Sequence, residues 1–168
     1  MKPPGQNSFD TMQELKELKK IPIRKAFVKD YDNIESAFKK TAKANGVEDY
    51  DKKIAAKLIK DSAPVIIELK KHFNRPRPKT AAIKMKITMK DVELPSMKTA
   101  SYPSGHSVQG LLIGSVLKNK YPKAGSAFMK TAENISYSRR VARAHYKSDS
   151  TMGEKLGKSM YKHIKNKI

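Results

Sequence analysis

Two histidines and an aspartate stand among clustered cations in the second half of the chain. His106 follows Ser104-Gly105, and His145 precedes Asp149 by one helical turn if this stretch is helical. Residues four apart share a face of a helix, so we expect the Asp149 carboxylate to accept the proton of His145 Nδ1. That contact would leave His145 Nε2 able to attack an electrophile. His106 would protonate a leaving alkoxide, because imidazole titrates in the required range.

The cations near these histidines are of types that bind phosphate. Lys70 precedes Arg77, and Arg139 precedes His145. All three would offset the charge of phosphoryl oxygens, and a guanidinium can bind two of them at once. Ser104 and Gly105, at an expected helix start, would add a hydroxyl, backbone N–H groups and the positive end of the helix dipole. These residue types together predict a site for a tetrahedral oxyanion.

Two of the cations fall on stripes that should be buried. Arg139 continues the apolar stripe that includes Phe128 and Ile135, and Lys70 continues a weaker stripe that includes Ile66. A buried cation without a partner costs several kcal/mol, so each of them needs an anion. The alternative is that a long stem carries the charge to solvent.

A divalent metal ion is an alternative ligand for His106, His145 and Asp149, because two imidazoles and a carboxylate can hold one. The three cations expected nearby would repel such an ion. We therefore expect no metal and no other cofactor. Cysteine is absent from the sequence, which excludes disulfides and thiolate ligands.

The three segments resemble the tripartite signature of the type 2 phosphatidic acid phosphatase superfamily, which includes the class A bacterial non-specific acid phosphatases and the vanadium haloperoxidases. That signature is Lys, six residues, Arg-Pro; then Pro-Ser-Gly-His; then Ser-Arg, five residues, His, three residues, Asp. All eleven positions are met, over a span of residues 70–149. They are Lys70, Arg77, Pro78, Pro103, Ser104, Gly105, His106, Ser138, Arg139, His145 and Asp149.

The resemblance implies an all-helical fold with the active site at one end of a bundle. It also implies a metal-independent phosphomonoester hydrolase of the acid phosphatase type, which acts through a phosphohistidine intermediate and is inhibited by vanadate. His145 would be the nucleophile, Asp149 its orienting carboxylate and His106 the acid. The phosphate ligands would be Lys70, Arg77, Ser104, Gly105 and Arg139.

Lipid-directed members of that superfamily carry several transmembrane helices. The longest strongly apolar stretch here, Gly110 to Leu117, is too short to span a bilayer. We therefore expect a protein similar to the soluble class A enzymes, with a nucleotide or another small phosphate ester as substrate. No apolar run follows Met1-Lys2, so we expect a cytoplasmic location.

Two other functions remain open. A formal charge of +20, with Lys84, Lys86 and Lys90 in a row and Arg139-Arg140 before Arg143, is also typical of a nucleic-acid-binding protein. A solvated surface explains these clusters more simply, although it would still attract polyanions without specificity. The second alternative is a vanadate-dependent haloperoxidase with the same pocket.

The elements expected to position these residues are helices, which predicts an all-α, single-domain bundle over residues 10–168 behind a flexible arm at 1–9. A long loop at 79–102 should lie near the site, with 83–89 either a short strand or an extended loop packed on one side. Gly153 and Gly157 should allow a second helix to pack closely. His72 and His163 should lie at the surface. The helices are expected at about 11–20, 30–46, 51–73 with a kink or fresh start at Pro64, 104–119, 123–143 and 148–165.

Overall fold

The protein is a helical bundle in which one central helix packs against several of the others. The computed structural model describes residues 1–166, and in that part of the chain it contains helices and no strand, which confirms the all-α prediction. The helices are α1 (Phe9–Lys20), α2 (Lys25–Asp32), α3 (Ile34–Ala44), α4 (Lys53–Phe73), α5 (Pro78–Lys84), α6 (Gly105–Lys120), α7 (Gly125–Val141) and α8 (Lys147–Ile164), with short 3₁₀ turns at Pro95–Lys98 and Pro122–Ala124.

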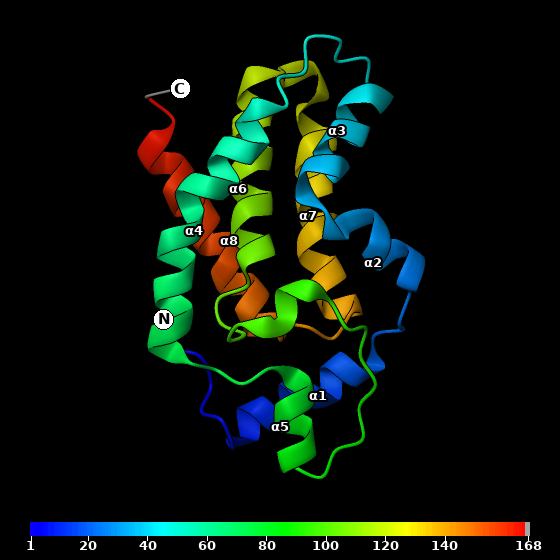
Figure 1. Cartoon of the computed structure of the whole chain (residues 1–168), viewed down its shortest axis with the longest axis vertical. Helices are drawn as coiled ribbons and strands as arrows, with labels where there is room; N and C mark the ends of the chain where they lie inside the picture. The colour runs from blue at the N-terminus through cyan, green and yellow to red at the C-terminus, as the bar shows by residue number, and fades with distance from the viewer. Residues whose placement is uncertain (167–168) are drawn as a thin grey trace.

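Helix α6 is the central element. In Figure 1, α4, α6, α7 and α8 run roughly along the long axis, and α1 and α5 lie at the lower end. Helix α6 packs most extensively against α7 and α8, and its apolar residues point in all directions. Its Leu112, Ile113 and Leu117 join the main core with Phe38 of α3 and Phe128 of α7.

Small residues let α8 lie directly on α6. A Cβ added at Gly157 would meet Val108 O at 2.5 Å, and one added at Gly153 would meet Ser104 O at 2.6 Å. No real Cβ tolerates such distances to backbone, so any larger residue would push the helices apart. The predicted role of these two glycines in close packing is confirmed, and the contact holds the start of α8 against the start of α6.

A separate apolar cluster ties the N-terminal helix to the lower end of the bundle. Leu15 of α1, Ala81 and Ala82 of α5, and Tyr146 at the start of α8 are buried together. The segment at residues 1–9 also makes contacts, because Tyr102 Oη donates to Met1 O at 2.7 Å. Helix α1 thus lies beside the segment that carries His145.

The predicted loop at 79–102 is partly wrong, because residues 78–84 form α5. Pro78 is the first residue of this helix, where its fixed φ and missing N–H are favourable. After α5 the chain is extended, and Met85, Ile87 and Met89 pack on one side against the α1–α5 cluster. The sequence predicts residues 83–89 to be either a short strand or a packed extended loop. The second alternative is correct for the part of this segment that follows the helix.

Helix α4 agrees with the helix predicted over 51–73, and it continues through Pro64, so of the two alternatives for Pro64 the fresh start is excluded. One helix differs from the prediction. The helix expected over 30–46 is divided into α2 and α3 by Asn33, whose Oδ1 accepts from Ser36 N at 2.8 Å and caps α3. The break makes Asp32 the last residue of α2.

Within residues 1–166, none of the helices combines the length and the apolar character that a bilayer crossing would need.

Candidate active site

The predicted site residues lie at helix ends that meet at the lower end of the bundle in Figure 1. Helix α4 ends and helix α6 begins there, and α7 ends and α8 begins there as well. Lys70 belongs to the last turn of α4, and Arg139 to the last turn of α7. Ser104 caps α6, so the predicted helix start at Ser104-Gly105-His106 is correct.

His145 lies between a carboxylate and a guanidinium. Its Nδ1 is 3.2 Å from Asp149 Oδ2, and its Nε2 is 2.9 Å from Arg77 Nη1. An ionised carboxylate only accepts hydrogen bonds and a guanidinium only donates them. The proton of neutral His145 is therefore on Nδ1, and the lone pair is on Nε2.

Asp149 is completely buried and serves the helix as well as the histidine. Its Oδ2 accepts from Tyr146 N at 3.1 Å and from the Ser101 hydroxyl, in addition to His145. The expectation that His145 and Asp149 share a helix face is wrong in detail, because α8 begins at Lys147. The two side chains still meet, since Asp149 turns back toward the residue that precedes the helix.

The loop before α6 covers the cations of the first signature segment. Arg77 Nε donates to Thr99 O at 2.8 Å, and its Nη2 donates to Ser96 O at 3.0 Å. Its Nη1 also donates to Ala144 O at 2.8 Å. Lys70 Nζ donates to Ala100 O. Carbonyl oxygens of residues 96–100 thus stabilise two buried cations.

Arg139 has no exposed surface, as its place on an apolar stripe predicts. Its Nη1 donates to Asp32 Oδ1 at 2.8 Å, and its Nε donates to Ser138 Oγ at 3.1 Å. Among the described residues, nothing accepts from its Nη2, although this atom is buried. An unsatisfied charged donor is costly in a protein interior, so this atom calls for a further acceptor.

His106 contacts the same aspartate. Its Nε2 donates to Asp32 O at 2.9 Å and is 3.9 Å from Asp32 Oδ1. A carbonyl oxygen only accepts, so this contact places a proton on His106 Nε2. Asp32 therefore connects His106 with Arg139.

Ser104 and Gly105 have roles in the helix start. Ser104 Oγ accepts from Ser107 N at 3.3 Å and from Ser107 Oγ at 2.9 Å, and Ser104 N donates to Asp149 O. A Cβ on Gly105 would lie 3.4 Å from Ile66 Cγ2, in van der Waals contact with this side chain of α4.

Burial and crowded cations shift the pKa values of this group of residues. Burial, followed by the fields of Arg77 and Lys70, lowers the pKa of His145 to about 3, and Asp149 only partly opposes this effect. Burial, Arg139 and Lys70 lower the pKa of His106 to about 4, against the raising effect of Asp32. Both imidazoles are therefore neutral at pH 7 in the free protein.

These charge interactions also show that the three signature segments lie close together. Lys70 acts on the pKa of both His106 and His145, and its own pKa is lowered to about 7 by burial and by Arg77. Burial lowers the pKa of Arg77 to about 10, and Arg139 contributes to the decrease. Cations held this close together are stabilised by an anion.

Sequence patterns missed three residues of this cluster: Glu14, Asp32 and Arg75. Each lies outside the eleven signature positions, and Glu14 and Asp32 are far from the histidines along the chain. Arg75 is the one that the sequence could have indicated, because it is a second arginine beside Arg77 at the end of a helix.

Other predicted features lie outside this cluster. His72 and His163 are exposed, as predicted. Arg143, which we considered as a nucleic-acid contact, donates to the backbone carbonyls of Lys19, Ile21 and Lys90. It therefore joins the C-terminal end of α1 to the extended segment at Lys90 and is not a freely solvated cation.

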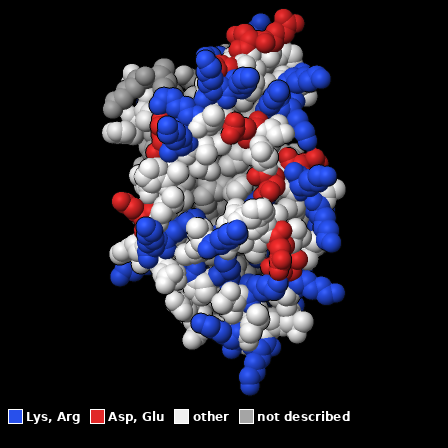
Figure 2. Space-filling model, in the orientation of Figure 1, with Lys and Arg blue, Asp and Glu red and all other residues white. Residues whose placement is uncertain are grey.

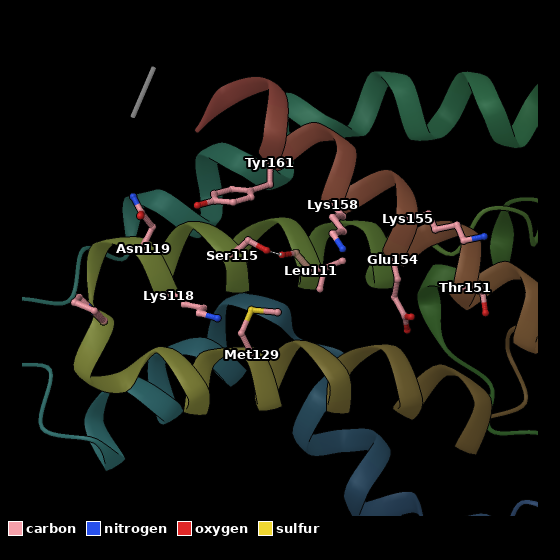
Figure 3. A pocket seen from close by; sticks show the side chains of 11 residues that line it. Leu111, Ser115, Lys118, Asn119, Met129, Thr151, Glu154, Lys155, Lys158 and Tyr161 are labelled. Carbon is pink, nitrogen blue, oxygen red and sulfur yellow. Dashed lines mark hydrogen bonds between the residues drawn. The ribbon is translucent and has the colours of Figure 1, made fainter. Parts of the chain in front are cut away.

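A cavity of about 700 Å³ lies between α6, α7 and α8 (Figure 3). Leu111, Met129 and Tyr161 contribute apolar surface, and Lys118 and Lys158 are also among its lining residues. None of the predicted site residues, all of which the structure describes, lines it. The cavity lacks the two histidines that the chemistry requires, so the helix-end cluster is the candidate active site.

Within residues 1–166, no three His, Asp or Glu side chains are grouped as metal ligands.

Comparison with protein families matches residues 54–164 to the PAP2 superfamily. The matched segment covers more than half of the chain and contains every signature position. No curated protein matches the chain.

Proposed function

Because the chain belongs to the PAP2 superfamily, we propose that it hydrolyses phosphate monoesters through a phosphohistidine intermediate on His145. Asp149 orients this histidine, and His106 is the proton donor. The enzyme is of the acid phosphatase type and uses no metal, since Lys70, Arg77 and Arg139 supply the positive charge that a metal would otherwise provide.

The observation that carries the proposal is the pair of contacts that His145 makes with Asp149 and Arg77. Asp149 Oδ2 lies 3.2 Å from His145 Nδ1, and Arg77 Nη1 lies 2.9 Å from His145 Nε2. Because the carboxylate accepts and the guanidinium donates, the lone pair of the imidazole is on Nε2. A nucleophilic imidazole needs this tautomer. A histidine with only a structural role would not need a guanidinium on the atom that attacks.

In the proposed reaction, His145 Nε2 attacks phosphorus while the bond from phosphorus to the ester oxygen breaks. His106 transfers a proton to the departing alkoxide, which leaves as an alcohol. Water then attacks the phosphohistidine and gives a proton to His106, and the bond from phosphorus to Nε2 breaks. Inorganic phosphate leaves, and both histidines return to their starting states.

When a phosphate ester binds in this scheme, its phosphoryl oxygens accept hydrogen bonds, some of which protein atoms accept in the free protein. The buried Nη2 of Arg139 has no acceptor among the described residues and is the donor most ready for a ligand. Arg77 leaves His145 Nε2 and bonds the phosphoryl group, while the Ser104 hydroxyl and the N–H of Gly105 donate from the start of α6. The dianion also offsets the cations around His106, which raises the pKa of His106 toward that of a useful acid.

The proposed substrate is a small phosphate ester such as a nucleotide. On the face shown in Figure 2, basic side chains frame a hollowed, largely uncharged area and are interrupted by acidic ones. They do not form a continuous track of the kind that a nucleic-acid backbone follows. A positive surface of this type increases the encounter rate of small anions.

The test is hydrolysis of p-nitrophenyl phosphate with release of inorganic phosphate, followed by trapping of the phosphoenzyme and measurement of its stability in acid and in base. We expect turnover and a base-stable, acid-labile phosphoryl adduct that His145→Ala abolishes. Lys147→Ala, a change at an exposed neighbour, is the control and should retain both. An adduct that survives in His145→Ala would assign the nucleophile to another residue.

A further inference from the structure

Arg75 is a buried arginine between two carboxylates. Only 2% of it is exposed, and its guanidinium lies 3.8 Å from the centre of the Tyr146 ring. Its Nη1 donates to Asp149 Oδ1 at 2.6 Å, and its Nη2 donates to Glu14 Oε2 at 2.8 Å. Nη1 also reaches Ser148 Oγ at 2.7 Å. The guanidinium therefore connects the orienting carboxylate of the site with α1.

Glu14 also holds the first turn of α8 in place. Its Oε1 accepts from Ser148 N at 2.7 Å, and its Oε2 accepts from Ser148 Oγ at 2.8 Å. Ser148 immediately precedes Asp149, so Glu14 fixes the backbone from which the orienting carboxylate projects. Residue 14 lies outside the segment that matches the superfamily, 54–164.

The two oxygens of Asp149 have separate partners. Oδ2 accepts from His145 Nδ1, and Oδ1 accepts from Arg75. A cation on Oδ1 draws electron density from the carboxylate and weakens it as an acceptor for His145. Glu14, on the other side of Arg75, opposes this effect because its negative charge partly neutralises the guanidinium. Such effects are large where water is excluded.

We propose that Arg75 and Glu14 are positioning residues that set, through Asp149, how strongly His145 is polarised for attack. This inference rests on the proposed function, in which His145 is the nucleophile. It makes α1 a component of the active site, although α1 contributes no group that touches the substrate. Partners behind a ligating or catalytic residue commonly adjust its basicity in this way.

A purely structural role predicts a different outcome. If the network only holds α1 and α8 together, loss of either charge weakens folding and leaves the His145–Asp149 contact unchanged or loosened in both cases. If the network tunes Asp149, loss of the Arg75 charge and loss of the Glu14 charge change the strength of Asp149 as a hydrogen-bond acceptor in opposite directions. Arg75→Gln strengthens Asp149 as an acceptor, and Glu14→Gln weakens it.

The experiment measures the His145 Nδ1–H proton by NMR at neutral pH, with His145→Gln used to assign the resonance. We expect a downfield shift in Arg75→Gln, an upfield shift in Glu14→Gln and a near-native position in Arg75→Lys, which retains the charge. Glu17→Gln on α1 and Lys71→Gln on α4 are exposed controls with the same charge changes, and they should leave the resonance in place. If Arg75→Gln does not fold, the upfield shift in Glu14→Gln and the unchanged controls still test the proposal.

Activity is measured on the same variants. The acid limb of kcat/KM should move to higher pH by about one unit in Arg75→Gln, because a less neutralised Asp149 favours protonated His145. It should move to lower pH in Glu14→Gln. NMR shifts in the same direction, or no shift in either variant, would overturn the inference. Opposite NMR shifts in a protein without phosphatase activity would leave the network intact and contradict the proposed function instead.

Discussion

Arg77 Nη1 donates to His145 Nε2 at 2.9 Å, so the proposed nucleophile is paired with one of its own phosphate ligands. The contact keeps the lone pair on the attacking nitrogen and burial keeps the imidazole neutral. A phosphoryl group that takes over the guanidinium would release Nε2 at the moment when the substrate is in place. The free protein is thus held in the protonation state that attack requires.

Replacement of the orienting carboxylate should reverse this arrangement. In Asp149→Asn the amide can donate to His145 Nδ1, which favours a proton on Nε2 and removes the nucleophile. We expect kcat for p-nitrophenyl phosphate to fall by about 10³-fold or more. Ser150→Ala is the control, because the Ser150 hydroxyl is buried without a described partner. A kcat in Asp149→Asn within a few-fold of the native value would contradict the role of Asp149.

The pH dependence should be acidic. Attack needs neutral His145, whose pKa is about 3, and protonation of the leaving group needs protonated His106, whose pKa is about 4. The profile of kcat/KM reports these groups in the free enzyme, so its maximum should lie at acid pH, and activity should fall as His106 loses its proton.

Asp32 should control the alkaline limb of this profile. Its charge raises the pKa of His106, so Asp32→Asn lowers that pKa further and His106 loses its proton at lower pH. We expect the alkaline limb of kcat/KM to move to lower pH. Asp30→Asn, on the same helix and exposed, should leave it unchanged. Movement to higher pH in Asp32→Asn would be inconsistent with the assigned acid.

The leaving group should reveal the acid directly. An alkoxide needs a proton to depart and p-nitrophenolate hardly does, so His106→Ala should slow an alkyl phosphate by about 10²–10⁴-fold and p-nitrophenyl phosphate much less. Steady-state kinetics with the two substrates measure the difference, and His72→Ala at the exposed histidine is the control. Equal losses on both substrates would remove His106 from this role.

Orthovanadate should inhibit competitively, because it adopts the trigonal bipyramidal geometry of the transition state between the cations and His145. EDTA should have no effect on turnover. Loss of activity after chelation, restored by a divalent ion, would refute the metal-free mechanism. Bromide or chloride oxidation by the vanadate-loaded protein with peroxide would favour the haloperoxidase alternative.

The contact between α8 and α6 should be essential to stability. In Gly157→Ala, the new Cβ would meet Val108 O at 2.5 Å, so α8 must move away from α6. We expect a loss of about 1–3 kcal/mol in the free energy of unfolding, measured by urea denaturation. Ser159→Ala on the exposed side of α8 should have little effect. An unchanged midpoint for Gly157→Ala would show that the helices can separate without cost.

The sequence by itself determined the helical class and the signature residues. Local signals are sufficient for both: the spacing of Arg139 on its apolar stripe predicts burial, and Ser104-Gly105 predicts a helix start. Within each of the three segments, the signature positions also lie at short intervals that a single sequence displays. The helix at Pro78–Lys84 was not predicted, because it is short and the alternation that follows it suits a strand or a packed loop.

Only the tertiary structure decided which charges neutralise the buried ones. Asp32 meets Arg139 across 107 positions, and Glu14 meets Arg75 across 61. No local period relates residues at such separations, and any of the acidic side chains could have been the partner. Packing of α1 and α2 around the lower end of the bundle selects these two, because desolvated arginines are stable only where the fold brings a carboxylate to them.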